Sequence, residues 1–233
     1  SLLGEIAEIE RNQGDAALSG KLVIGATAMI AETELPRLCV EFMQRHPQVT
    51  IRVESESVGD LFERLGRFEL ETALIENFPA VDGIELTHWK TDELVLVVTP
   101  DHALARQGTL TCEDLAGFAW CTREANSSVT ARLRYLLHEK IGQFPVAFES
   151  TSNWAVRHAV MAGGGIGCLS RELVRYDVET GRLVELGISD FSYTRSLSLA
   201  RPRAIRRNRL VTAFDHFLLA NGDGQSQAID FLE

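Results

Sequence analysis

Small hydroxyl and amide side chains stand where expected strands give way to expected helices. Thr27 follows one such strand, Ser127 and Ser128 follow a second, and Asn153 begins another helix. A helix start presents unpaired backbone N–H groups and the positive end of the helix dipole, which attract anions and polar groups. These residues are therefore candidate ligand contacts. The same side chains can also cap their helices, and the two roles are compatible.

Neighbours of these residues complete the candidate binding set, which adds Ala28, Met29, Glu76, Asn77 and Arg123. Glu76 and Asn77 end an expected strand, on the side of a sheet where ligands collect. They can equally form an ordinary solvated strand end. Glu76 disfavours a simple anion unless a cation such as Arg123 offsets it. The charge of the ligand therefore stays open.

The sequence contains no recognisable catalytic or metal-binding motif. There is no G-x-S-x-G, His138-Glu139 lacks the second histidine of H-E-x-x-H, and the 6 histidines are isolated from one another. Glycines 163, 164, 165 and 167 follow an expected helix and precede a strand, the reverse of the order in nucleotide-binding loops. They predict a helix stop and a tight turn. We expect a protein that is not an enzyme, with no cofactor and no metal.

Apolar periodicity predicts strands that alternate with helices in each half of the chain. Strands are expected at 22–26, 49–53, 72–76, 119–122, 146–149 and 166–169, and helices at 35–43, 57–65, 129–141 and 152–161. Both halves have the same strand–helix order. This order favours an α/β fold with two mainly parallel sheets.

Two further strands, at 93–99 and around 193–199, suggest how the halves are joined. The simplest arrangement places residues 20–95 and 197–233 in lobe I and residues 96–196 in lobe II. The closing helix, from Ile205 to Leu218, would pack on lobe I. Two Rossmann-like lobes joined by two crossing strands leave a cleft at the carboxyl ends of their sheets, where small ligands bind.

Composition excludes several partners. The 233 residues include 23 Lys plus Arg and 33 Asp plus Glu, and the net charge of −10 repels nucleic-acid backbones. No apolar run approaches the ~20 residues of a membrane span, so no membrane association is expected. The 4 scattered cysteines predict buried, reduced thiols in a cytoplasmic protein.

Six segments together carry a family resemblance. They are LVIGATAMIAETELP (22–36), FMQRHPQVTIRV (42–53), RFEL before ETALIE (67–76), ELVLVVTPDHALA (93–105), TREANSSVTARL (122–133) and AVMAGGGIGCLS (159–170). In this order they resemble the effector-binding domain of LysR-type transcriptional regulators, over about residues 20–220. The resemblance implies a cytoplasmic regulator with the periplasmic-binding-protein type 2 architecture. It also implies a homodimer or homotetramer, an effector that is a polar or anionic metabolite, and DNA contacts only through an N-terminal winged helix-turn-helix absent here.

The resemblance also implies roles for particular residues. Thr27 matches the small hydroxyl residue that follows the first strand in the family. Ser127 matches the serine of a Gly-Ser-Gly-Thr-like turn, and Asn153 matches the polar residue that begins the next helix. Residues 1–19 correspond to the end of a linker helix. The sequence departs from the family pattern at Ala28, Met29, Ala31, Ser128 and Val129. These replacements imply a less polar pocket than that of many relatives.

Three functions are compatible with two lobes of this kind. In a regulator, an effector held by both lobes would shift their relative angle or the packing between sensor domains, through its differential affinity for the two arrangements. A solute-binding protein of a transport system is the main alternative, and it requires an export signal or a lipid anchor. A hydrolase or dehydratase on the same fold is a distant third.

Overall fold

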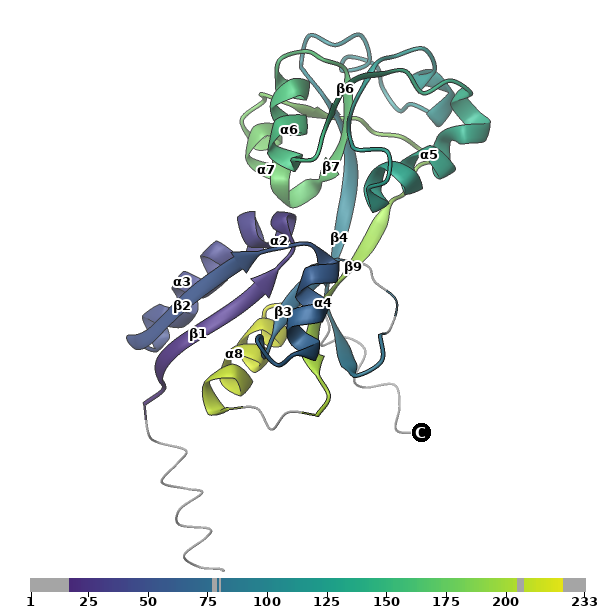
Figure 1. The fold of residues 1–233 in the computed structure, drawn as a ribbon. Coiled ribbons are helices and arrows are strands. Elements are labelled where there is room, and N and C mark those ends of the chain that lie inside the picture. The colour runs from purple at the N-terminus through teal and green to yellow at the C-terminus, as the bar shows by residue number, and fades with distance from the viewer. Residues whose placement is uncertain (1–16, 77–78, 80, 205–207, 224–233) are drawn as a thin grey trace, which may run out of the picture. The chain divides into compact units, whose positions relative to one another are not determined.

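The computed structural model describes residues 17–76, 79, 81–204 and 208–223 (Figure 1). Three expectations fall on other residues and so lie outside the described part of the chain. They concern most of the linker helix, Asn77, and the start of the closing helix at Ile205.

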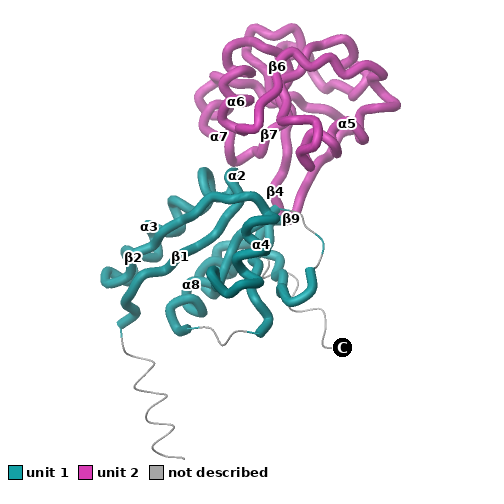
Figure 2. Tube along the Cα trace, in the orientation of Figure 1, with its two compact units in different colours: residues 1–90, 197–233 teal, residues 91–196 magenta. Residues whose placement is uncertain are grey.

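The chain forms two compact units. Unit 1 contains residues 1–90 and 197–233, and unit 2 contains residues 91–196 (Figure 2). Two strands carry residues of both units, namely β4 (Ile84–Val98) and β9 (Thr194–Pro202), and they are neighbours in the strand order. The chain therefore passes from unit 1 to unit 2 along β4 and returns along β9.

Unit 1 is a mixed sheet with helices, and its strand order is β2-β1-β3-β9. Its other elements are β1 (Ser19–Ala26), α2 (Ala28–Glu32), α3 (Glu34–Arg45), β2 (Gln48–Ser55), α4 (Val58–Gly66), β3 (Ala73–Glu76) and α8 (Arg209–Ala220). Strands β1, β2 and β3 are parallel, and Ala26 at the end of β1 pairs with Ser55 of β2 and with Leu74 of β3. The carboxyl ends of these three strands therefore lie at one edge of the sheet (Figure 1).

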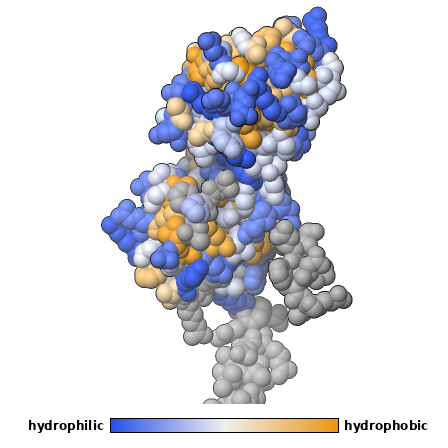
Figure 3. Space-filling model, turned by 90° about the vertical axis from the view of Figure 1, so that its right-hand side faces the viewer, coloured by the Kyte–Doolittle hydropathy of each residue, from blue (hydrophilic) through white to orange (hydrophobic). Residues whose placement is uncertain are grey.

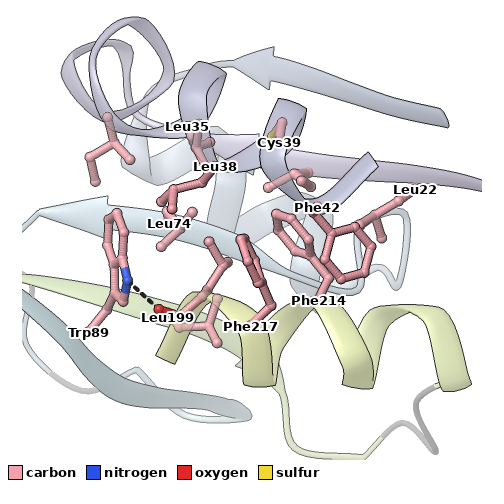
Figure 4. Packing of buried hydrophobic residues seen from close by; sticks show 14 of the residues in the cluster. Leu22, Leu35, Leu38, Cys39, Phe42, Leu74, Trp89, Leu199, Phe214 and Phe217 are labelled. Atoms are coloured by element: carbon pink, nitrogen blue, oxygen red, sulfur yellow. Dashed lines mark hydrogen bonds between the residues drawn. The ribbon is translucent and has the colours of Figure 1, made fainter. Parts of the chain in front are cut away.

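The main core of unit 1 lies between its sheet and helices α3 and α8 (Figure 4). The rings of Phe42 and Phe214 meet edge to face, with centroids 5.1 Å apart. Trp89 is fully buried, and its indole N–H donates a hydrogen bond to the Leu218 carbonyl oxygen at 2.8 Å. Burying a large apolar side chain contributes roughly 1.5–3 kcal/mol. These contacts confirm the expectation that the closing helix packs on the first lobe, and they place Trp89 in the same core.

Unit 2 has the strand order β4-β7-β5-β6, and β8 also pairs with β4. Its elements are the short 3-10 helix η1 (Cys112–Leu115), β5 (Trp120–Arg123), α5 (Ser128–Ile141), β6 (Val146–Ser150), α6 (Asn153–Met161), β7 (Ile166–Ser170), α7 (Arg171–Glu179) and β8 (Val184–Glu185). Strand β5 is parallel to β6 and β7, and Arg123 at its end pairs with Ser150. The carboxyl ends of β5 and β6 therefore share one edge.

Two apolar clusters cover the two faces of this second sheet. Trp120 packs with Leu133 of α5 on one face, and Cys121 packs with Val156 of α6 and Leu173 of α7 on the other. Successive residues of a strand point to opposite faces, which accounts for the division at Trp120 and Cys121.

A glycine turn joins α6 to β7. Gly163 has φ +86° and Gly165 has φ +127°, values that L side chains rarely adopt. A Cβ atom on Gly165 would lie 2.1 Å from the carbonyl oxygen of Ala119. The Ile166 N–H donates to the same oxygen at 2.8 Å. These glycines form a helix stop and a close turn, as the sequence predicts.

Some elements were not expected from the sequence. The first half of β4, with residues 84–92, was missed because Thr87, His88 and Lys90 interrupt its apolar pattern, and pairing within the fold overrides weak local propensity. Helix α7 was also missed, because it begins directly after β7 with no intervening turn. Strands β1, β2 and β3 pair in parallel, as do β5, β6 and β7, but β4 and β9 add antiparallel to β7 and β3, so the sheet pairing is mixed rather than mainly parallel.

The 4 cysteines are all buried and free, which confirms the sequence expectation of buried thiols. Burial raises the pKa of Cys39 and of Cys168 to about 12, so both thiols stay protonated at neutral pH.

The face shown in Figure 3 is mostly hydrophilic, with apolar side chains gathered in places on both units. In the part of the chain that the structure describes, the large apolar residues with substantial exposure are Val40, Phe68, Tyr135, Phe148 and Tyr176. Among the described residues, no helix combines the length and the apolar character that crossing a bilayer requires.

Candidate functional site

Thr27 stands at the carboxyl end of β1 in unit 1, directly before α2. Its N–H donates to the Leu74 carbonyl oxygen at 3.1 Å, which ties it to the end of β3. Its side chain does not cap α2. The residue is only 6% exposed, and its hydroxyl forms no hydrogen bond with any described residue. A buried hydroxyl without a partner costs about 1–3 kcal/mol, so this one is available to a ligand.

The other unit 1 candidates divide between the edge and the core. Ala28 is exposed at the start of α2, and Glu76 is half-buried at the end of β3. Thr27 and Glu76 share the same sheet edge because β1 and β3 are parallel. Met29, by contrast, lies in the main apolar core.

Thr122 in unit 2 is, like Thr27, a buried threonine whose hydroxyl has no described partner, and sequence reasoning did not select it. It is the residue before the last in β5, is 4% exposed, and its hydroxyl has no partner among the described residues. A threonine inside the strand sequence WCTR is an ordinary strand residue by type. Only the packing around it shows that its hydroxyl is unsatisfied.

Arg123 is the last residue of β5, and its side chain forms an ion pair with that of the next residue, Glu124. Its Nε and Nη2 donate to the two carboxylate oxygens of Glu124 at 2.9 and 3.0 Å. Burial raises the pKa of Glu124, but the hydrogen bonding to Arg123, a backbone hydrogen bond and the charge of Arg123 together outweigh burial and leave this pKa below its ordinary value. Within unit 2, the positive charge of Arg123 is paired with the carboxylate of Glu124.

The remaining unit 2 candidates stand at helix starts. The Ser127 hydroxyl accepts a hydrogen bond from the Thr130 N–H at 3.2 Å and so caps α5, while Ser128 is the exposed first residue of that helix. Asn153 is the half-buried first residue of α6. Capping is therefore observed at Ser127 and not at Thr27.

The unsatisfied hydroxyl of Thr122 leads to a stability prediction. Thr122→Val keeps the side-chain shape and removes a polar atom that has no partner, so the free energy of unfolding should stay unchanged or rise. Thr130 is the matched control, because its hydroxyl is also buried but donates to the Arg123 carbonyl oxygen at 3.0 Å. Thr130→Val should lower the free energy of unfolding by about 0.5–1.5 kcal/mol. Urea unfolding of both variants checks this, and equal losses would contradict it.

Within the described parts of the chain, no group of three His, Cys, Asp or Glu side chains is arranged to hold a metal ion.

Comparisons with known proteins identify the family. The family described as LysR substrate binding domain matches residues 15–223. The uncharacterized HTH-type transcriptional regulator YeiE of Escherichia coli strain K12 is 30% identical over 188 residues, or 81% of this chain. This chain spans 63% of the length of that regulator.

Solved structures show the same fold. The regulatory domain of Synechocystis PCC6803 CcmR, in complex with 2-PG, has a TM-score of 0.77 at 22% identity, covering 88% of this chain and 98% of that one. The effector binding domain of QuiR, in complex with shikimate, has a TM-score of 0.73 at 19% identity, with the same coverage of 88% and 98%. The architecture is thus the α/β periplasmic-binding-protein type 2 fold of these domains. This chain belongs to the LysR substrate binding domain family.

Proposed function

We propose that this chain is the ligand-sensing domain of a LysR-type transcriptional regulator, and that strand-end residues of its units bind a small-molecule effector. The observation that carries the proposal is the pair of buried, unpartnered hydroxyls on Thr27 and Thr122. Each belongs to the end of a parallel strand, the position at which α/β sheets bind ligands. Ala28, Glu76, Arg123, Ser127, Ser128 and Asn153 stand at the same strand ends or at helix starts beside them and complete the proposed contacts.

Relatives support the chemistry of this effector. The CcmR domain is described with 2-PG and the QuiR domain with shikimate, both small polar anions. We extend this class to the effector of this chain, a polar or anionic metabolite. Transcriptional control would be exerted through a DNA-binding segment outside these residues, in a cytoplasmic homodimer or homotetramer. The relatives described above are regulators or their sensing domains, which favours this function over solute transport.

A metabolite screen tests the proposed function. Small organic acids, including 2-PG and shikimate, are added to the purified chain and the melting temperature is measured. An effector at 100 times its Kd should stabilise the chain by about 2.7 kcal/mol. The absence of any binder in a broad screen would remove the sensing function. Turnover of a binder into product would instead support an enzyme, an activity that we do not propose.

Thr27→Val and Thr122→Val should each weaken effector binding without loss of stability. Removing one hydrogen bond to the ligand raises its Kd about two- to thirteenfold. Isothermal titration calorimetry with a binder from the screen measures this change. Thr50→Val on the exposed side of β2 is the control for Thr27, and it should leave the Kd unchanged. An unaltered Kd in both strand-end variants would exclude these hydroxyls from the site.

A further inference from the structure

Arg123 and Glu124 form an ion pair that copies the way proteins bind a carboxylate ligand. Both carboxylate oxygens of Glu124 accept from one guanidinium, at 2.9 and 3.0 Å. A two-point contact of this kind is the geometry by which arginine selects carboxylates and phosphates. The carboxylate here comes from the adjacent residue of the same chain.

This guanidinium stands where the proposed function places ligand contacts. Arg123 is the last residue of β5, it pairs in register with Ser150 of β6, and it follows the unsatisfied Thr122 directly. Among the described residues, Glu124 is the one carboxylate that forms an ion pair with Arg123. The two side chains are 21% and 28% exposed, so solvent and solutes reach the pair.

We propose that Glu124 is a specificity-determining residue whose carboxylate occupies the Arg123 guanidinium until an anionic group of the effector, a carboxylate or a phosphate, takes its place. The inference rests on the proposed function and names the class of ligand group that its unit 2 site selects. It goes beyond the strand-end hydroxyls, which any polar ligand can use.

The exchange is energetically accessible. Water screens this partly exposed ion pair and two side chains lose freedom in it, so its net contribution is on the order of a fivefold change in affinity, which an effector anion with further contacts can exceed. An effector anion keeps the two-point contact with Arg123 and adds hydrogen bonds to other donors of the proposed site. Glu124 then turns to solvent, where its carboxylate is hydrated.

The Arg123–Glu124 ion pair also disfavours the binding of other ligands. With Glu124 in place, the end of β5 carries no net charge from these two residues, so a cationic ligand finds no excess negative charge there. A weakly interacting anion must compete with Glu124 for the same donors, which lowers its affinity. Selectivity thus favours ligands whose anionic group is supported by further contacts.

Anion titrations of the whole chain test the exchange. Acetate, malonate and inorganic phosphate are titrated at constant ionic strength, with chloride as the reference salt, and the Nε–H signal of Arg123 is followed by NMR. The signal is identified by its loss in Arg123→Lys. In Glu124→Gln the apparent Kd for malonate or phosphate should fall about two- to fivefold relative to the unaltered chain. Glu124→Ala should show the same direction of change.

Glu139→Gln is the matched control, because Glu139 is an exposed carboxylate on α5 with the same charge. It should leave the apparent Kd unchanged. The inference is overturned if the apparent Kd falls equally in Glu139→Gln, or if it is unaltered in both Glu124 variants. It is also overturned if the Arg123 signal shows no saturable shift. An effector from the metabolite screen that binds without moving this signal overturns it too, while leaving the sensing function intact. A screen without binders removes the function, although the small-anion competition can still be observed.

Discussion

Asp177→Ala should lower the free energy of unfolding by about 3–5 kcal/mol. Asp177 lies on α7 and is fully buried. The Nε and Nη2 of Arg157 on α6 donate to its two carboxylate oxygens at 2.6 and 2.7 Å, and Arg182 pairs with it at 2.9 Å. Removing the carboxylate leaves the buried guanidinium of Arg157 without its counter-charge.

Asp177→Ala should also affect the candidate site. The ion pair of Arg157 with Asp177 connects α6 to α7, and Arg157 also stacks over Trp154 of its own helix, with its guanidinium carbon 4.8 Å from the ring centroid. Asn153 begins this helix. We therefore expect Asp177→Ala to disturb residues near Asn153 as well as overall stability.

Denaturation followed by circular dichroism measures the effect of Asp177→Ala. Glu179→Ala on the same helix is the control, because the ion pair that Glu179 forms with Arg175, at 3.5 Å, is exposed. This exposed pair contributes about 0.5 kcal/mol or less. Similar losses in the two variants would contradict a special role for the buried pair.

Gly165→Ala should be comparably damaging, with an expected loss of about 3 kcal/mol or more in the free energy of unfolding. Two costs combine at this residue. A φ of +127° is strained for any L side chain, and the new Cβ would lie 2.1 Å from the Ala119 carbonyl oxygen. This oxygen belongs to backbone and already accepts a hydrogen bond from Ile166, so it cannot move away without loss.

Gly163→Ala separates the two costs, because Gly163 has φ +86° but a Cβ added there would meet no atom within 4 Å among the described residues. The free energy of unfolding of Gly163→Ala should fall only by the cost of the backbone strain, about 1–2 kcal/mol. Thermal and urea unfolding of both variants measure the difference. If Gly165→Ala lowers the free energy of unfolding no more than Gly163→Ala does, the close approach to Ala119 adds no cost of its own.

Local patterns predicted most of the elements around the candidate site. Ser57, Ser127 and Ser152 each stand before a helix, and in the structure each accepts a backbone N–H three residues on. A cap is a contact within one short segment, so residue type and spacing suffice to predict it. The glycine turn is predictable for the same reason, because Gly163 and Gly165 have a positive φ, a backbone conformation that favours glycine.

The order of elements and the alternation of strands and helices were determined by the sequence itself, because apolar periodicity records which side of each segment is buried. Whether a polar group at a strand end is satisfied depends on residues distant in the chain, so only the tertiary structure decided it. Thr27 and Ser127 look alike in sequence, yet one hydroxyl is buried without a partner and the other caps a helix. The pairing of Arg123 with Glu124, and the unsatisfied state of Thr122, likewise became visible only once packing had fixed their surroundings.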